Sequence, residues 1–90
     1  MCTVVLPQTL RGLARGERAL DLSGATVGEV LDALGAEHPA LARRIRDEQG
    51  ALRRFVNVYV DGEDVRYCGG TDAAVGAASE VRILPSVAGG

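Results

Sequence analysis

The residue best suited to chemistry in this sequence is the last one, Gly90, because its α-carboxyl group can be activated by another protein. A free α-carboxyl group has a pKa of about 3.5, so at neutral pH it is an anion that resists nucleophilic attack. A reaction at this carbon therefore needs prior activation that removes the negative charge and supplies a leaving group. The sequence has no Gly-x-x-x-x-Gly-Lys-Ser/Thr motif for binding phosphate, so activation by a nucleotide would need a second protein.

The residues before Gly90 suit a tail that enters a narrow channel. Gly89 and Gly90 have no Cβ atom and present the smallest possible cross-section, and Val87 and Ala88 precede them. Pro85 stiffens the chain where the tail begins. We therefore expect Val87, Ala88 and Gly89 to thread Gly90 into the active site of a second protein.

The other reactive side chains are weaker candidates. A reactive thiol needs nearby positive charge or a helix N-terminus, and Cys68 has only Arg66 close in sequence. We predict that Cys68 is an ordinary, partly buried cysteine and that Cys2 lies in the core. The single histidine, His38, has no second ligand at a useful spacing, so we expect no metal site.

Two clusters of charged residues indicate no specific function. Asp61, Glu63 and Asp64 are expected to form a solvated turn, because calcium loops space their ligands over a longer run. The arginines within residues 43–54 suit contact with an acidic partner, although a charged helix end and loop normally face water.

The composition favours one small folded domain. The 90 residues are 47% hydrophobic and 24% charged, with a formal net charge of −2, which disfavours nucleic-acid binding. All 10 basic residues are arginine, so the chain offers no lysine for isopeptide linkage to further copies. No apolar run reaches the length of a membrane span, and a disulfide framework needs more cysteines than the 2 present. We expect a cytoplasmic protein.

Five segments have the alternation or apolar character of strands, namely residues 2–6, 17–22, 53–60, 63–67 and 80–84. In the third of these, Val56, Val58 and Val60 share one face. The dipeptide Asp61-Gly62 after it is a strong hairpin signal.

Helices are predicted between the second and third strands and, as one short turn, over residues 73–78. Thr26 and Glu29 form a capping box before an apolar face at helical spacing, and Gly35 is expected to stop this helix. A second, shorter helix is expected from Pro39.

The order of elements predicts an α+β fold of the β-grasp (ubiquitin-like) type over residues 1–85, followed by a flexible tail over residues 86–90. A mixed sheet of four to five strands would be covered on one face by the main helix and the short helix. The last strand would lie centrally beside the first.

Strand alternation places a candidate docking surface on the other face of that sheet. Phe55, Tyr59, Arg82 and Leu84 should point away from the helices. Exposed aromatic and apolar groups beside a charged one suit a partner interface, but some of these side chains could instead cover the edge of the core.

Nearly the whole chain resembles the ThiS/MoaD family of ubiquitin-like sulfur carriers, and within it most closely the CysO type. The strongest stretches are Arg54-Phe55-Val56-Asn57-Val58-Tyr59-Val60, Glu63-Asp64-Val65-Arg66 and the ending Ile83-Leu84-Pro85-Ser86-Val87-Ala88-Gly89-Gly90. Gly-Gly at the end of a β-grasp pattern is much more specific than Gly-Gly alone.

The resemblance implies the chemistry of the tail. An ATP-dependent activating enzyme would adenylate Gly90, and a sulfur donor would displace AMP to leave a thiocarboxylate. In the CysO type, a cysteine synthase that works on O-phosphoserine accepts the sulfur, and a zinc metalloprotease then releases the new cysteine. The protein would be a co-substrate rather than an enzyme, and would bind no cofactor itself.

Other functions remain open at this point. A thiazole, molybdopterin or another sulfur-containing product would use the same tail. A ubiquitin-like modifier would pass the same adenylate to an amine. A non-catalytic adaptor domain would not need Gly89 or Gly90.

Overall fold

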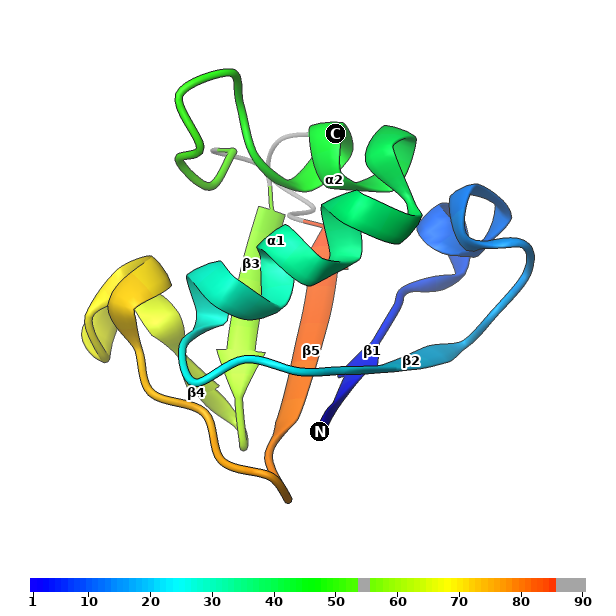
Figure 1. The fold of residues 1–90 in the computed structure, drawn as a ribbon. Helices are drawn as coiled ribbons and strands as arrows, with labels where there is room; N and C mark the ends of the chain where they lie inside the picture. Colours follow the sequence, from blue (N-terminus) through cyan, green and yellow to red (C-terminus); the bar gives the residue numbers. More distant parts are fainter. Residues whose placement is uncertain (54–55, 86–90) are drawn as a thin grey trace.

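A computed structural model of the 90-residue chain describes residues 1–53 and 56–85. The strands are β1 (Cys2–Val5), β2 (Ala19–Leu22), β3 (Val56–Val60), β4 (Glu63–Asp64) and β5 (Glu80–Pro85); the α-helices are α1 (Val27–Glu37) and α2 (Pro39–Ile45); the 3-10 helices are η1 (Gln8–Ala14), η2 (Val65–Tyr67) and η3 (Gly70–Asp72). Figure 1 shows α1 and α2 on one side of the sheet.

Within the described residues, the strands form one mixed sheet in the order β2-β1-β5-β3-β4. The central strand, β5, runs parallel to β1, with Val4 opposite Val81. It runs antiparallel to β3, with Val58 opposite Ile83. The predicted central position of the last strand beside the first is confirmed, and so is the predicted α+β fold of the β-grasp type.

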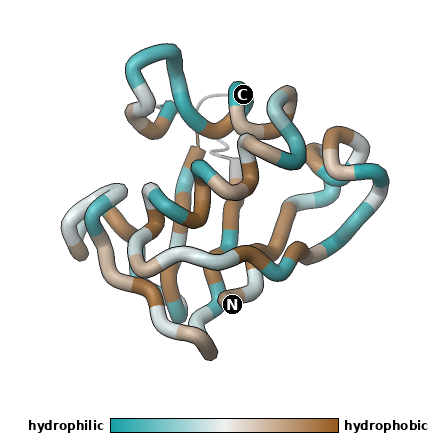
Figure 2. The backbone as a smooth tube through the Cα atoms, in the orientation of Figure 1, coloured by the Kyte–Doolittle hydropathy of each residue, from teal (hydrophilic) through white to brown (hydrophobic). Residues whose placement is uncertain are grey.

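The core lies between the sheet and the two α-helices. Figure 2 shows hydrophobic residues recurring along the strands and α1, as alternation and helical spacing predict. The largest fully buried side chains are Leu6, Leu31, Leu34, Leu41, Ile45, Ile83, Val4, Val27, Val30, Val58, Val65 and Val81. They come from both layers, so burial of these side chains joins the helices to the sheet.

The start of α1 is fixed by its predicted cap. The Thr26 hydroxyl accepts a hydrogen bond from the Glu29 N–H at 3.2 Å, and the Glu29 carboxylate accepts one from the Ala25 N–H at 3.1 Å. Gly24 lets the chain pass close to the helix, because a Cβ atom there would lie 2.7 Å from the Val30 nitrogen. The capping prediction is confirmed, with Glu29 reaching one residue earlier than a standard capping box does.

The predicted stop at Gly35 is wrong, because α1 continues to Glu37. Gly35 instead lies where α1 meets α2, and a Cβ atom on it would be 3.3 Å from the Cβ atom of Ala42. The glycine allows the two helices to pack closely, so its role is in tertiary contact rather than in helix termination. The predicted second helix from Pro39 is confirmed.

The tight turn predicted at Asp61-Gly62 is present, with φ of 50° and 89° at the two residues. Asp61 also holds the start of β5, because its carboxylate accepts a hydrogen bond from the Glu80 N–H at 2.9 Å. The return strand ends at Asp64, since that carboxylate caps η2 by accepting the Arg66 N–H at 2.9 Å. The predicted continuation of this strand to residue 67 is therefore wrong.

Three other local predictions differ from the structure. The segment predicted as a loop between Gly12 and Gly16 is mostly the 3-10 helix η1, and β3 begins after Arg53 rather than at it. Residues 73–78 form no helical turn, because Ala74 pairs with Thr26 and the Val75 N–H donates to the Ala25 carbonyl. These long-range hydrogen bonds override the helix propensity of the alanines.

The longest helix in the described ranges, α1, has 11 residues, and none of the helices there is long and apolar enough to span a membrane.

The cap on α1 gives a direct test of local stability. We expect Thr26→Ala to lower the free energy of unfolding by about 1 kcal/mol, because the Glu29 N–H loses its acceptor. Urea unfolding followed by circular dichroism measures this change. The exposed Thr9→Ala is the matched control, expected within about 0.5 kcal/mol of wild type. Equal stabilities for the two variants would contradict the role given to the cap.

Candidate functional site

The central strand β5 separates an inner face from an outer one and leads toward the tail. Val81 and Ile83 are fully buried, whereas Leu84 is 37% exposed and the Arg82 side chain is 47% exposed. The strand ends at Pro85, at the end of the sheet beside α2. The predicted reactive residue Gly90 and the predicted threading residues, Val87, Ala88 and Gly89, lie outside the described residues.

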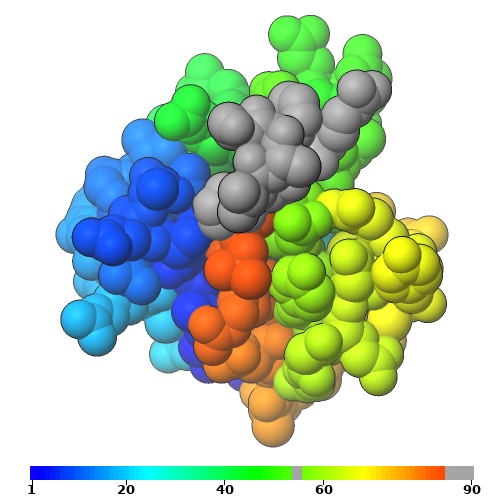
Figure 3. Space-filling view, turned by 180° about the vertical axis from the view of Figure 1, so that it is seen from behind, coloured from blue at the N-terminus to red at the C-terminus, as the bar shows by residue number. Residues whose placement is uncertain are grey.

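The outer face of the sheet brings together three of the four predicted docking residues. Tyr59 of β3 lies opposite Arg82, and Leu84 is the next outward residue on β5, opposite Asn57. On the other side of β5, Val5 pairs with Arg82. Figure 3 shows this face, with β5 between β1 and β3. The fourth residue, Phe55, lies outside the described residues.

The positive charge on this face is partly balanced along its own strand. Arg82 Nη2 lies 3.3 Å from Glu80 Oε2, two residues earlier in β5. Both side chains are about half exposed, so this ion pair contributes little to stability. Breaking this ion pair so that Arg82 can bind a partner would therefore cost little free energy.

A groove of about 550 Å³ opens beside the place where the tail begins. It is lined by Thr9, Leu10, Arg43, Arg44, Arg53, Val56, Ile83 and Leu84. Its walls come from η1, α2 and the adjoining ends of β3 and β5, which are distant in sequence. The sequence showed the arginines but not the apolar floor, because no helix or strand was predicted for the segment that contains Leu10.

The two cysteines have different environments. Cys2 is buried as predicted, and burial raises the pKa of its thiol. Cys68 is exposed, so its predicted partial burial is wrong. Its thiol donates a hydrogen bond to Glu63 Oε2 at 3.3 Å, and this bond is the main reason that the pKa of Cys68 is raised. A raised pKa opposes nucleophilic sulfur chemistry at neutral pH.

The remaining candidates have structural surroundings. His38 is the N-cap residue of α2 by its backbone position, but its side chain makes no capping hydrogen bond. Across residues 1–53 and 56–85, no group of three or more His, Cys, Asp or Glu side chains is placed to hold a metal ion. In the acidic turn, Asp61 and Asp64 accept backbone N–H groups, as described above.

The β-grasp sheet, with its last strand at the centre and leading out at one end, defines a small ubiquitin-like protein. The chain belongs to the ThiS family of ubiquitin-like sulfur carriers, which it matches over residues 4–90. The resemblance found in the sequence is thus confirmed.

Several known proteins are similar to the chain over nearly their whole length. The sulfur carrier protein CysO of Mycobacterium tuberculosis is 42% identical over 90 residues, which cover 98% of this chain and 97% of CysO. A chain in the crystal structure of the BexX/CysO complex of Amycolatopsis orientalis has a TM-score of 0.92 and 42% identity, and all of both chains is covered. Small archaeal modifier protein 1 of Methanosarcina acetivorans has a TM-score of 0.85 and 34% identity, over 99% of this chain and 95% of that one.

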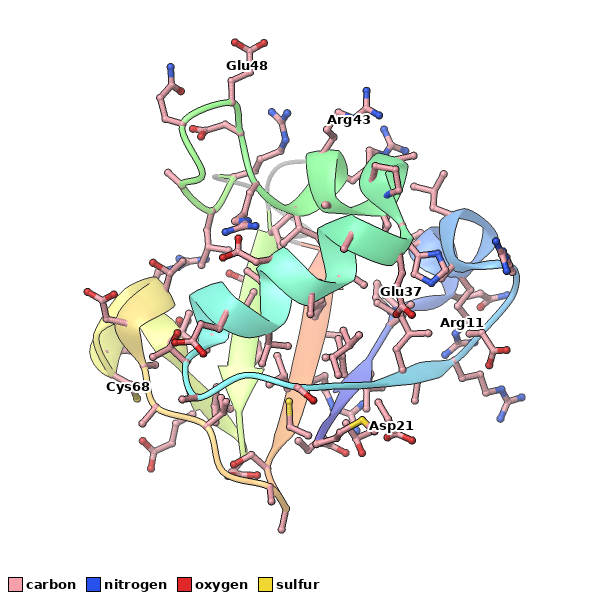
Figure 4. The ribbon with its side chains drawn as sticks, in the orientation of Figure 1. Arg11, Asp21, Glu37, Arg43, Glu48 and Cys68 are labelled. Carbon is pink, nitrogen blue, oxygen red and sulfur yellow. The ribbon has the colours of Figure 1, made fainter. Side chains whose placement is uncertain are left out.

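The environment of Cys68 predicts slow alkylation. Because Glu63 raises the pKa of the Cys68 thiol, less thiolate is present at pH 8, and Glu63→Gln should increase the rate of reaction with iodoacetamide about two- to fivefold. Peptide mapping by mass spectrometry measures the rate at Cys68 separately from that at Cys2. The matched control Glu48→Gln removes an exposed charge from another loop (Figure 4) and should leave the rate unchanged. Equal rates for the two variants would contradict this explanation.

Proposed function

We propose that this protein carries sulfur as a thiocarboxylate on Gly90 and donates it in biosynthesis. The observation that supports this most is the match to the ThiS family through residue 90, on a domain whose central strand ends at Pro85. The domain would act as a co-substrate in the cytoplasm, and its partners would supply catalysis.

Activation of the carboxylate would take two steps. A Gly90 carboxylate oxygen attacks the α-phosphorus of ATP, and pyrophosphate leaves. Hydrosulfide supplied by the donor then adds to the acyl carbon and expels AMP, and loss of the S–H proton leaves a thiocarboxylate in which sulfur has replaced one oxygen. Because the tail has five residues after Pro85, it reaches at most about 18 Å from the sheet. The activating enzyme would therefore bind the domain outside and enclose the tail.

The acceptor of the sulfur is proposed from the similarity to CysO. We propose a synthase that forms cysteine from O-phosphoserine, followed by a zinc metalloprotease that releases cysteine from the tail. A CysO protein of Amycolatopsis orientalis is in a complex with BexX, which supports the proposal that this chain binds a partner protein. Synthases that make thiazole, molybdopterin or another sulfur-containing metabolite would accept the same thiocarboxylate.

The outer face of the sheet is the proposed docking surface for these enzymes. Arg82 and Leu84 are exposed and Tyr59 is half-buried on the adjacent strand, and Leu84 lies directly before Pro85. Phe55 belongs to the same proposal by strand alternation, although it lies outside the described residues.

Conjugation to proteins is a second candidate function, favoured by the similarity to small archaeal modifier protein 1. The same acyl-adenylate would then pass to a lysine amine of a target protein. Recovery of lysine-linked adducts of the protein from cells would favour this function over sulfur transfer.

The main test of thiocarboxylate formation is to change the size of the last residue. After incubation with the adenylating enzyme of the same organism, ATP and sulfide, the wild-type protein should gain about 16 Da, the difference between sulfur and oxygen. We expect Gly90→Ala, or one alanine added after Gly90, to slow this gain about 100-fold, because the acyl carbon is misplaced in the channel. Intact-mass spectrometry measures the product.

The matched control is Gly12→Ala, since a Cβ atom at Gly12 meets nothing within 4 Å and its φ is not positive. This variant should gain mass at the wild-type rate. A gain of the same size and rate in either tail variant would contradict the proposal.

The proposed docking surface predicts a change in KM. We expect Leu84→Asp to raise the KM for the carrier in ATP–pyrophosphate exchange about tenfold, because a charge replaces an apolar contact beside the tail. Leu13→Asp is the matched control, since Leu13 is 36% exposed and Leu84 is 37% exposed. Similar KM values for both variants would place the docking surface elsewhere.

A further inference from the structure

The groove beside the end of β5 combines an apolar floor with exposed positive charge. Leu10, Val56 and Ile83 form its buried floor. Arg43, Arg44 and Arg53 form what we call the arginine rim, and all three are exposed. Among residues 1–53 and 56–85, no carboxylate lies within 4.0 Å of a guanidinium nitrogen of this rim.

Backbone contacts hold part of the arginine rim in place. Arg53 Nε donates to the Arg43 carbonyl at 2.6 Å, and Arg43 Nε donates to the Pro39 carbonyl at 3.4 Å. Both contacts use the Nε–H group rather than the terminal Nη groups. An arginine anchored in this way loses less side-chain freedom when it binds a carboxylate.

Three acidic residues, Asp32, Asp47 and Glu48, line a second hollow that shares Arg43 with the groove. Asp32 pairs with Arg46 at 2.7 Å, and Asp47 accepts the backbone N–H groups of Gln49 and Ala51. Figure 4 shows Glu48 on the loop after α2, with its carboxylate pointing outward from the molecule. None of the three acidic residues lines the groove itself, so the lining of the groove is positive although the whole chain has a net charge of −2.

We propose that this groove binds an acidic segment with an aliphatic or aromatic side chain, carried by the enzyme that receives the tail. Carboxylates of the segment would pair with the arginine rim, and its apolar side chain would cover the floor. Leu84 belongs both to the groove and to the outer face of the sheet, so the two surfaces are continuous. The identity of the enzyme rests on the proposed function, whereas the chemistry of the segment rests on the groove.

The length of the tail separates this contact from the reaction centre. Five extended residues place Gly90 up to about 18 Å from Pro85, whereas Leu84 lies in the groove itself. The acidic segment would thus lie at the entrance of the partner's channel rather than at the ATP phosphates.

A titration of the full chain tests the groove without ATP or any enzyme. The probe is the blocked peptide Asp-Glu-Leu-Glu-Asp-Phe, added to ¹⁵N-labelled protein and followed by NMR. We expect saturable shifts at the amides of Leu10, Val56, Ile83 and Leu84. Arg43→Gln combined with Arg44→Gln should weaken binding about three- to tenfold, and glutamine keeps a helix propensity close to that of arginine.

The matched control is Arg15→Gln combined with Arg18→Gln, which removes equal charge from exposed residues that do not line the groove. It should bind the peptide as wild type does. The inference is overturned if the groove amides do not shift or if the rim variant binds equally well. It is also overturned if sodium phosphate, or the basic peptide Lys-Arg-Leu-Arg-Lys-Phe, gives the same shifts. Because no activation step is involved, these outcomes are independent of thiocarboxylate formation.

Discussion

The pairing of β5 with both β1 and β3 is the constraint on which the rest of the molecule depends. Hydrogen bonds on both edges fix the strand, and full burial of Val81 and Ile83 prevents a shift of register by one residue, which would expose them. The start of the strand is held as well, by the hydrogen bonds between Asp61 and Glu80. As a result, the position of Pro85, the last residue of β5, is set by the core.

The tail that ends at Gly90 and the surfaces proposed to bind a partner are therefore different parts of the protein. The end of β5 at Pro85 lies next to two surfaces, the outer face of the sheet and the groove with its arginine rim, and Leu84 joins them. The opposite end of the sheet carries Asp61 and Glu80, whereas the lining of the groove has three arginines and no acidic residue. A net charge of −2 hides this difference. A partner with an acidic entrance to its channel would be oriented with that entrance toward the tail.

Local patterns in the sequence predicted the fold well where a single mechanism decides the structure. The capping box at Thr26 and the alternation along β3 and β5 are such cases. Prediction failed where tertiary contacts decide, as at Gly35, which packs against α2, and in residues 73–78, which bond to the segment before α1. The groove was not predictable for the same reason, because its walls come from four elements whose approach no local pattern encodes.

The central claim is that the domain displays a terminal glycine whose carboxylate becomes a thiocarboxylate. Intact-mass and C-terminal peptide analysis of the protein purified from its native host tests this most directly. The account predicts a chain that ends at Gly90, part of it heavier by about 16 Da with the sulfur on that residue. A chain that continues past Gly90 with no trimmed form would contradict the account.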